Sequence, residues 1–505
     1  MSVNFDYKTQ VLVVGAGSAG VTAALAAARN GATTLLIERS GFLGGISATL
    51  PWLGFHDREY RQVVKGLAQE FVRDLVADGD AVDPCLDPKC GSTFSFNFHA
   101  WKIMAMRKME EAGVKVLLHA VYVDTLREND RITGVVIETK TGRQNIGADV
   151  VIDCSGDGDV AARGGLTWEK GRTKDGLVQS PTLVFRIGGV NRQELVNACK
   201  DPAYNYREWL DPYPDVRERF VANLDDLPSF IFGGFADLMQ QARDAGELDV
   251  PQSRVVGVKL HEEDEFMAVM TRVLGLDPTN VDNMSNAFSS LYKQVTPIMN
   301  FFRKWVPGFS QCVLREIAPI MGVRESRRII GDYILTGEDV IAGTEFEDAV
   351  SMGGYHIDIH RPSGSWVESY NVQAYTIPLR SLISKDAENL LMAGKCISAT
   401  HEAIGSTRVI PICMGQAQAV GTVSAMAVNK NKSVRDISVH DLQNTLIDQG
   451  AEIGQSLGEP NLEAIEKYGQ LPLEDAEKTS GEGDPVTSGA WLSSKREERE
   501  VGSGD

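Results

Sequence analysis

The stretch Gln10-Val-Leu-Val-Val-Gly15-Ala-Gly17-Ser-Ala-Gly20 decides the fold of this chain. It opens with a continuous apolar run of strand-forming residues, which is typical of a buried strand. The alanine-rich segment from Val21 to Arg29 favours a helix, and Asn30-Gly31 is a helix stop signal. Thr33–Ile37 predicts a second buried strand that ends at Glu38. The sequence therefore predicts a strand, a helix and a strand, joined at the first turn by a glycine loop.

Each glycine of this loop has a physical task. Gly15 makes the tight turn, Gly17 lets the backbone approach a pyrophosphate, and Gly20 lets the helix pack on the strand. The phosphates are favoured at the helix N-terminus, where free N–H groups and the positive end of the dipole lie. Glu38 follows Gly20 by 18 residues, where a ribose-binding carboxylate belongs.

The pattern predicts a dinucleotide site, and a purely structural glycine turn is the alternative. The residues expected to contact the dinucleotide are Gly15, Gly17, Ser18, Gly20, Glu38 and Arg39.

A second glycine cluster, Gly44-Gly45, follows the ribose carboxylate directly. Here the chain resembles the flavoprotein oxidoreductases, in which such a cluster lets extended FAD pass close to the backbone. The segment Ala148–Asp159 looks like the strand and Ala-Thr-Gly-Asp element of these proteins, with Ser155 in place of threonine. The resemblance implies that Gly44, Gly45, Ser155 and Gly156 contact FAD, which we expect to be bound non-covalently.

The segment Asn389–Pro411 resembles the closing flavin-binding element of FAD-dependent oxidoreductases related to the succinate dehydrogenase and fumarate reductase flavoproteins. Together with Met321–Tyr333, it extends the resemblance over roughly residues 8–430. Many flavoproteins have Gly-Asp where this chain has Gly394-Lys395, so the hydrogen bond to the ribityl chain must come from elsewhere. The flavin contacts that this element implies are Gly394, Gly405, Ser406 and Thr407.

The implied fold class is α/β, with a Rossmann-like FAD-binding domain of the glutathione-reductase type and an inserted α+β cap or substrate domain. We expect the FAD-binding domain to consist of residues 1–175 and 385–430, with the cap at 176–384 between them. Residues 431–505 should form a C-terminal helix and an acidic, mobile tail, because the last part of the chain has little to bury.

Three histidines are the candidates for proton transfer. Polar and apolar residues alternate from Tyr355 to Arg361, so on a strand His356, Asp358 and His360 would share one face. Histidine suits acid–base work near neutral pH, and a nearby carboxylate can raise its pKa. A structural strand is the alternative, and we expect no metal site because no further Cys or His cluster accompanies the segment. His401, within the flavin motif, contacts flavin or substrate or else makes a structural hydrogen bond.

Arg324 and Arg408 are the candidates for charge stabilisation. Guanidinium groups bind carboxylates bidentately, so these residues could clamp an anionic substrate, as the resemblance to fumarate and succinate enzymes implies. The alternative for the arginines of these segments, Arg327, Arg328 and Arg361 included, is ion pairing with neighbouring acidic residues.

The composition narrows the class of partner. The chain of 505 residues has 50 Lys and Arg against 69 Asp and Glu, a net charge of −19 that disfavours nucleic acid. Seven cysteines, an odd number, and the lack of a signal-like start or of an apolar run of about 20 residues favour the cytoplasm over secretion or membrane insertion. A homodimer would be ordinary.

These features predict an FAD-dependent oxidoreductase that transfers a hydride between a small organic substrate and flavin N5, with proton transfer by histidine. The sequence does not name the substrate, the direction or the electron acceptor. The alternatives are an FAD-binding electron-transfer subunit of a larger complex and a flavin monooxygenase.

Overall fold

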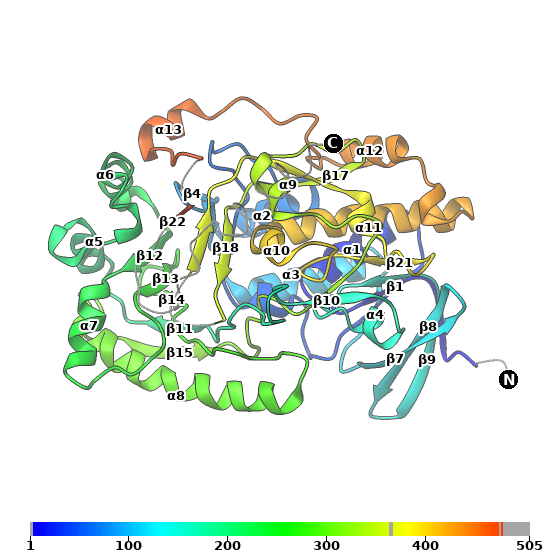
Figure 1. Ribbon diagram of the computed structural model, residues 1–505, viewed down its shortest axis with the longest axis horizontal. Coiled ribbons are helices and arrows are strands. Elements are labelled where there is room, and N and C mark those ends of the chain that lie inside the picture. The colour runs from blue at the N-terminus through cyan, green and yellow to red at the C-terminus, as the bar shows by residue number, and fades with distance from the viewer. Residues whose placement is uncertain (1–3, 363–366, 474–475, 478–505) are drawn as a thin grey trace, which may run out of the picture.

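The main sheet of the protein is built around one long central strand, β9 (Figure 1). The computed structural model describes residues 4–362, 367–473 and 476–477. One edge of β9 pairs with β1, while the other edge pairs first with β8 and then, over its last three residues, with β21. The strands of this sheet are β1 (Tyr7–Val14), β2 (Thr34–Ile37), β6 (Lys115–Leu117), β7 (Val121–Glu128), β8 (Arg131–Thr139), β9 (Gly142–Asp153) and β21 (Leu390–Met392).

Strands β6, β2, β1, β9 and β21 run parallel, whereas β7 and β8 form an antiparallel extension. The predicted strand, helix and strand unit is therefore confirmed as β1, α1 (Ser18–Arg29) and β2. Strand β21 comes from a part of the chain far from β9 in sequence, so one sheet joins two distant segments. The parallel order and the crossover helix are those of a Rossmann-like α/β fold.

Helix α1 is held between the sheet and α11 (Ile410–Lys430) by small residues. An added Cβ at Gly421 of α11 would lie 2.3 Å from the carbonyl oxygen of Ala23 in α1, so the two helices approach closely. Pro411 lies in the first turn of α11, where its missing N–H costs no hydrogen bond. The other helices of this part are α2 (Gly66–Ala77), α3 (Phe98–Glu111), α4 (Asp159–Arg163), α9 (Gly337–Ala342), α10 (His401–Thr407) and α12 (Val439–Asp448).

Short antiparallel sheets flank the main sheet. Their strands are β3 (Trp52–Leu53), β4 (Cys85–Asp87), β5 (Gly91–Phe94), β10 (Trp168–Lys170), β16 (Arg327–Ile329), β17 (Ala349–Gly353), β18 (Ile357–His360), β19 (Val367–Tyr370), β20 (Tyr375–Pro378) and β22 (Ala476–Glu477). The 3₁₀ turns are η1 (Gly45–Ala48), η2 (Pro202–Tyr204), η3 (Glu208–Leu210), η4 (Leu224–Asp226), η5 (Leu379–Ser381) and η6 (Val434–Asp436).

A second part of the structure, drawn green in Figure 1, lies at the end of the molecule opposite to β7, β8 and β9. Its antiparallel sheet has the order β12-β13-β14-β11-β15 and its own apolar core. The elements are β11 (Phe185–Gly188), β12 (Phe230–Gly234), β13 (Val255–Lys259), β14 (Phe266–Ala268), β15 (Val313–Ile317), α5 (Arg192–Lys200), α6 (Pro214–Ala222), α7 (Ala236–Asp244) and α8 (Val281–Trp305). We call this part the cap.

Two later segments complete the packing. Residues from Ala318 to Ile383 join the core of the main sheet rather than that of the cap. Helix α13 (Leu462–Tyr468) returns to the cap, where Ala464 and Tyr468 enter its core. Most of the predicted acidic tail lies outside the described residues.

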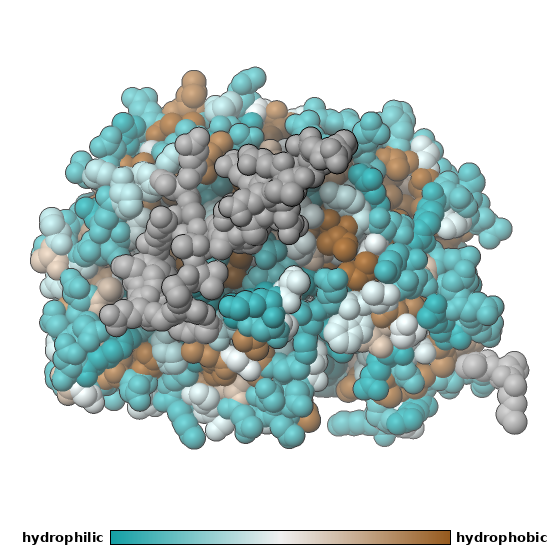
Figure 2. Space-filling view, in the orientation of Figure 1, coloured by the Kyte–Doolittle hydropathy of each residue, from teal (hydrophilic) through white to brown (hydrophobic). Residues whose placement is uncertain are grey.

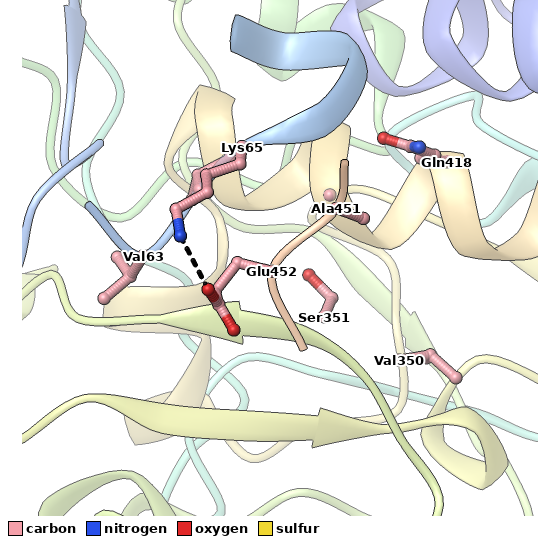
Figure 3. Close-up of a pocket in the computed structure, with 9 residues that line it drawn as sticks. Val63, Lys65, Val350, Ser351, Gln418, Ala451 and Glu452 are labelled. Atoms are coloured by element: carbon pink, nitrogen blue, oxygen red, sulfur yellow. Dashed lines mark hydrogen bonds and ion pairs between the residues drawn. The ribbon is translucent and has the colours of Figure 1, made fainter. Parts of the chain in front are cut away.

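The segment after α12 is fastened to the start of α2. In Figure 3 the Lys65 side chain points at Glu452, and the distance from Nζ to Oε2 is 2.8 Å. Glu452 also accepts hydrogen bonds from the Gly454 N–H and the Ser456 hydroxyl. The adjoining cavity measures only about 10 Å³, which is room for about one water molecule. This ion pair therefore connects the segment after α12 to the start of α2.

Hydrophilic residues dominate the face seen in Figure 2 outside the grey segments, in keeping with the net charge of −19. Within the described ranges, no single helix is long and apolar enough to cross a membrane, and α10 and α11 would qualify only as a pair bent by 94°.

The contact between α1 and its loop yields a stability test. At Gly20 an added Cβ would lie 1.8 Å from the Gly15 carbonyl oxygen, so we expect Gly20→Ala to lower the free energy of unfolding by about 1–3 kcal/mol or more. Gly458→Ala, at an exposed glycine with no atom within 4 Å of the new Cβ, is the control and should be nearly neutral. Urea unfolding of both variants measures this, and equal stability of the two would contradict the packing.

Candidate functional site

The glycine loop after β1 exposes backbone at the N-terminus of α1. Gly15 has φ +92°, and a Cβ there would lie 2.6 Å from the Cys154 carbonyl oxygen. At Gly20 the Gly15 carbonyl oxygen leaves no room for a Cβ. Gly17 has no atom within 4 Å of an added Cβ and lines a large cavity. Gly15 and Gly20 therefore build the turn, and Gly17 exposes the backbone to a ligand.

The N-terminus of α1 is available for an anion. Its cap residue is Gly17, which has no side chain to accept a hydrogen bond from the first-turn N–H groups. Glu38 braces the loop from the end of β2, since its carboxylate accepts from the N–H groups of Ala16 and Ser40, both at 2.8 Å. A carboxylate has further lone pairs, so Glu38 can brace the loop and still accept hydrogen bonds from a ligand.

The residues directly after β9 form the opposite wall of the cavity at the glycine loop. Asp153 is fully buried and accepts hydrogen bonds from the Ser155 hydroxyl and from the N–H groups of Ser155 and Val160. The Ser155 side chain is thus occupied in shaping the turn, and Gly156 lines the cavity beside it. On the side of the second cluster, the Gly44 N–H donates to the Ala16 carbonyl oxygen at 2.7 Å.

A carboxylate, that of Asp157, lies next to the Gly394-Lys395 pair. Lys395 Nζ lies 2.7 Å from Asp157 Oδ1 and also donates to the Gly156 carbonyl oxygen. Burial raises the pKa of Asp157, but Lys395 and Arg39 outweigh this and hold it below its usual range. Both Asp157 and Lys395 line the cavity, so the acidic group comes from the β9 turn instead of the closing motif. Asp157 is not among the residues that the motifs predict to contact the cofactor, although it directly follows Ser155-Gly156.

One cavity of about 1140 Å³ connects this loop with the cap. It is larger than the roughly 300–1,000 Å³ that is usual for a drug-sized ligand. The sequence-predicted residues that line it are Gly15, Gly17, Ser18, Glu38, Arg39, Gly44, Gly45, Ser155, Gly156, Arg324, His356, His360, Gly394 and Arg408. Lys89, Tyr355, Asp358 and Arg272 line it as well.

The remaining predicted residues do not line the cavity: Gly20, His401, Gly405, Ser406 and Thr407. Gly405 packs on β18, where an added Cβ would meet Ile357 at 3.1 Å. Ser406 donates to the Tyr355 carbonyl oxygen, and the Thr407 carbonyl oxygen accepts from Gln416 at 3.1 Å. His401 Nδ1 lies 2.8 Å from Glu325 Oε2. These positions fit a bracing role for α10.

The cavity wall at β18 gathers charged groups. His360 Nε2 lies 3.2 Å from Asp358 Oδ2, and Arg408 Nη2 lies 3.3 Å from the same oxygen. Arg324 Nη1 donates to the Ser180 carbonyl oxygen at 2.6 Å. Among the described residues Arg324 has no carboxylate within ion-pair distance, whereas Arg327, Arg328 and Arg361 pair with Asp159, Glu325 and Glu368. The ion-pairing alternative thus applies to these three arginines and, through Asp358, to Arg408.

Burial keeps the histidines of this wall neutral. It lowers the pKa of His360 to about 3, with the Arg324 charge acting in the same direction. Asp358 raises this pKa, in keeping with the expected effect of a nearby carboxylate, but burial and the Arg324 charge determine the net direction, which is downward. Burial and Lys89 lower the pKa of His356 to about 3.

Arg324 keeps its charge at neutral pH even though burial and the nearby Arg408 charge lower its pKa to about 9. A guanidinium with no partner carboxylate, beside neutral imidazoles, favours an anion that also offers or accepts a proton. In the part of the chain that is described, no three His, Cys, Asp or Glu side chains are grouped to hold a metal ion.

Comparison with known proteins assigns the chain to a family. A family model described as FAD dependent oxidoreductase matches residues 10–446. The thiamine thiazole synthase of Aeropyrum pernix is 30% identical over 173 residues, which is 32% of this chain and 60% of that protein. The matched part therefore spans less than two thirds of this relative's length.

Two solved structures are similar to this chain at low sequence identity. The p-nitrophenol 4-monooxygenase PnpA from Pseudomonas putida DLL-E4 has a TM-score of 0.45 and 10% identity, with 92% of this chain and 94% of that one covered. A flavocytochrome c3 fumarate reductase has a TM-score of 0.37 and 15% identity, with 84% and 79% covered.

The neutral histidines give the protein a pH dependence. Their folded pKa values lie below the ordinary 6.5, so the unfolded chain binds more protons and stability should fall as the pH drops from about 6.5 toward 3. The slope is at most about 1.4 kcal/mol per pH unit for each histidine. Urea unfolding between pH 4 and 7 measures it. His360→Gln should flatten the slope and the exposed control His440→Gln should not; equal slopes in all three proteins would refute the assignment.

Proposed function

The chain belongs to the FAD-dependent oxidoreductase family, and from this premise we propose that it transfers a hydride between a small organic acid and flavin N5, with His360 handling the proton. The observation that supports this proposal is the single cavity. It runs from the bare backbone at Gly17 to the charged wall at Arg324 and His360.

The residues of the glycine-loop end fit FAD. A Cβ is excluded at Gly15 and Gly20 but not at Gly17, and the α1 N-terminus lacks a side-chain cap, which together make a cradle for a pyrophosphate. Glu38 would hold the ribose and Gly44 and Gly45 would line the extended cofactor. FAD, when bound, supplies the hydride donor or acceptor.

The charged wall would bind and orient the substrate. Arg324, which has no ion-pair partner among the described residues, would take one carboxylate of the substrate. Arg408 is anchored by Asp358, since Nη2 donates to the Asp358 carbonyl oxygen at 2.9 Å. Its Nε is buried without a partner among the described residues and would be a further donor to the substrate.

His360 would be the proton acceptor. Its imidazole is neutral in the free protein, and the Arg324 charge is one reason. A substrate carboxylate on Arg324 offsets that charge, so binding raises the proton affinity of His360 at the moment when a proton must be taken up. Asp358 would hold the ring in place through the 3.2 Å contact.

Arg324→Met tests this function. In anaerobic mixing with small carboxylic acids and their unsaturated counterparts, at least one pair should reduce or reoxidise the flavin of the parent protein. We expect Arg324→Met to slow that reaction by about 10²-fold at limiting substrate, as for loss of a charged hydrogen bond of roughly 3 kcal/mol, with the FAD content unchanged.

Arg143→Met, at a side chain that is 72% exposed, is the matched control and should react like the parent. A parent flavin that no carboxylic acid reduces or reoxidises would overturn the proposal, and reduction by a protein partner alone would favour the electron-transfer subunit.

A further inference from the structure

The cap sheet has two apolar faces, of which one packs in the cap core and the other belongs to the larger core cluster together with part of α8. Alternate residues of β12 and β13 point to opposite faces. Phe230, Phe232 and Val255 enter the cap core together with Phe266 of β14. An antiparallel sheet that faces water on one side carries polar residues there, so the second apolar face of this sheet is not a solvent-facing surface.

The second face lines the cavity. Ile231 of β12 is the register partner of Val258 in β13, so these side chains lie next to each other on one face. Val256 lies two residues before Val258, and its carbonyl oxygen accepts from the Val269 N–H at 2.9 Å. All four side chains line the cavity. We call Ile231, Val256, Val258 and Val269 the apolar strip.

Helix α8 extends this apolar lining. Val281, Met284 and Phe288 follow the i, i+3, i+7 spacing of one helix face, and all three line the same cavity. Val281 is 75% exposed, so this lining reaches the molecular surface. The cavity thus combines a charged wall at Arg324 with an apolar arm that ends at solvent.

We propose that the substrate is an amphipathic monocarboxylate, whose carboxylate binds Arg324 and whose extended hydrocarbon part lies along the apolar strip. This inference rests on the proposed function and specifies its substrate class. A short dicarboxylate would leave the strip without a partner, and its second charge would gain nothing from aliphatic side chains. An extended hydrocarbon part gains free energy with each methylene that it buries.

Calorimetric titration of the flavin-loaded protein with straight-chain monocarboxylates tests the proposal without requiring turnover. Each added methylene should tighten binding by up to about fourfold until the strip is covered, and the heat-capacity change should become more negative. Dicarboxylates of equal length should bind more weakly. Affinities that do not depend on chain length, or tighter binding of short dicarboxylates, would overturn it.

Two variants locate the effect. Ile231→Asn should weaken long-chain acids at least tenfold and leave short-chain acids and FAD content unchanged, which also shows that the protein is folded. Ile103→Asn, at an isoleucine that is 70% exposed and outside the cavity, is the matched control. Equal chain-length dependence in both variants would refute the assignment to the strip. Because binding and flavin reduction are measured separately, tight long-chain binding without reduction would contradict the proposed function alone.

Discussion

The close approach of α1 to the loop after β1 is the constraint on which the rest of the structure depends. Gly20 lies so near the Gly15 carbonyl oxygen that only a missing side chain allows the contact. This contact points the N-terminus of α1 into the cavity, with Gly17 as its N-cap residue. Glu38 then fixes the loop through the Ala16 N–H. The same backbone geometry that permits tight packing therefore also provides an anion site.

At the other end of the cavity, charges are kept in a buried environment. An isolated buried charge is costly, and Asp358 reduces that cost for Arg408 but not through direct contact for Arg324. The protein thus holds a cationic guanidinium next to neutral imidazoles. A bound anion would lower the electrostatic cost of burying the Arg324 charge, so the site favours such a ligand.

The local parts of this arrangement could be predicted from the sequence. The apolar run before Gly15 and the alanine-rich segment after Gly20 specify β1 and α1 by pattern alone, although α1 starts at Ser18 rather than Val21. FAD as cofactor, which the resemblance of the Gly44-Gly45 cluster and of the Asn389–Pro411 segment to flavoproteins implies, is confirmed by the family. The assigned contacts of Glu38 and Gly17 remain predictions that the geometry supports.

Tertiary properties could not be predicted in this way. His401 and Ser406 belong to a motif that resembles a flavin element, yet α10 packs on β18 and the cavity does not reach them. The net pKa shift of His360 depends on burial and on Arg324, which is remote in sequence. The partnership of Lys395 with Asp157 joins two strand ends that only the sheet brings together. The apolar strip is visible only once the register of β12 and β13 is known.

The most direct test of the central claim, that one cavity holds FAD against the charged wall, is the visible absorption spectrum of the purified protein before and after acid precipitation. We expect flavin bands from about one FAD per chain, released into the supernatant by acid. We also expect these bands to shift when a carboxylate is added to the native protein, since the carboxylate would bind next to the flavin. A colourless protein that takes up no added FAD would contradict the account.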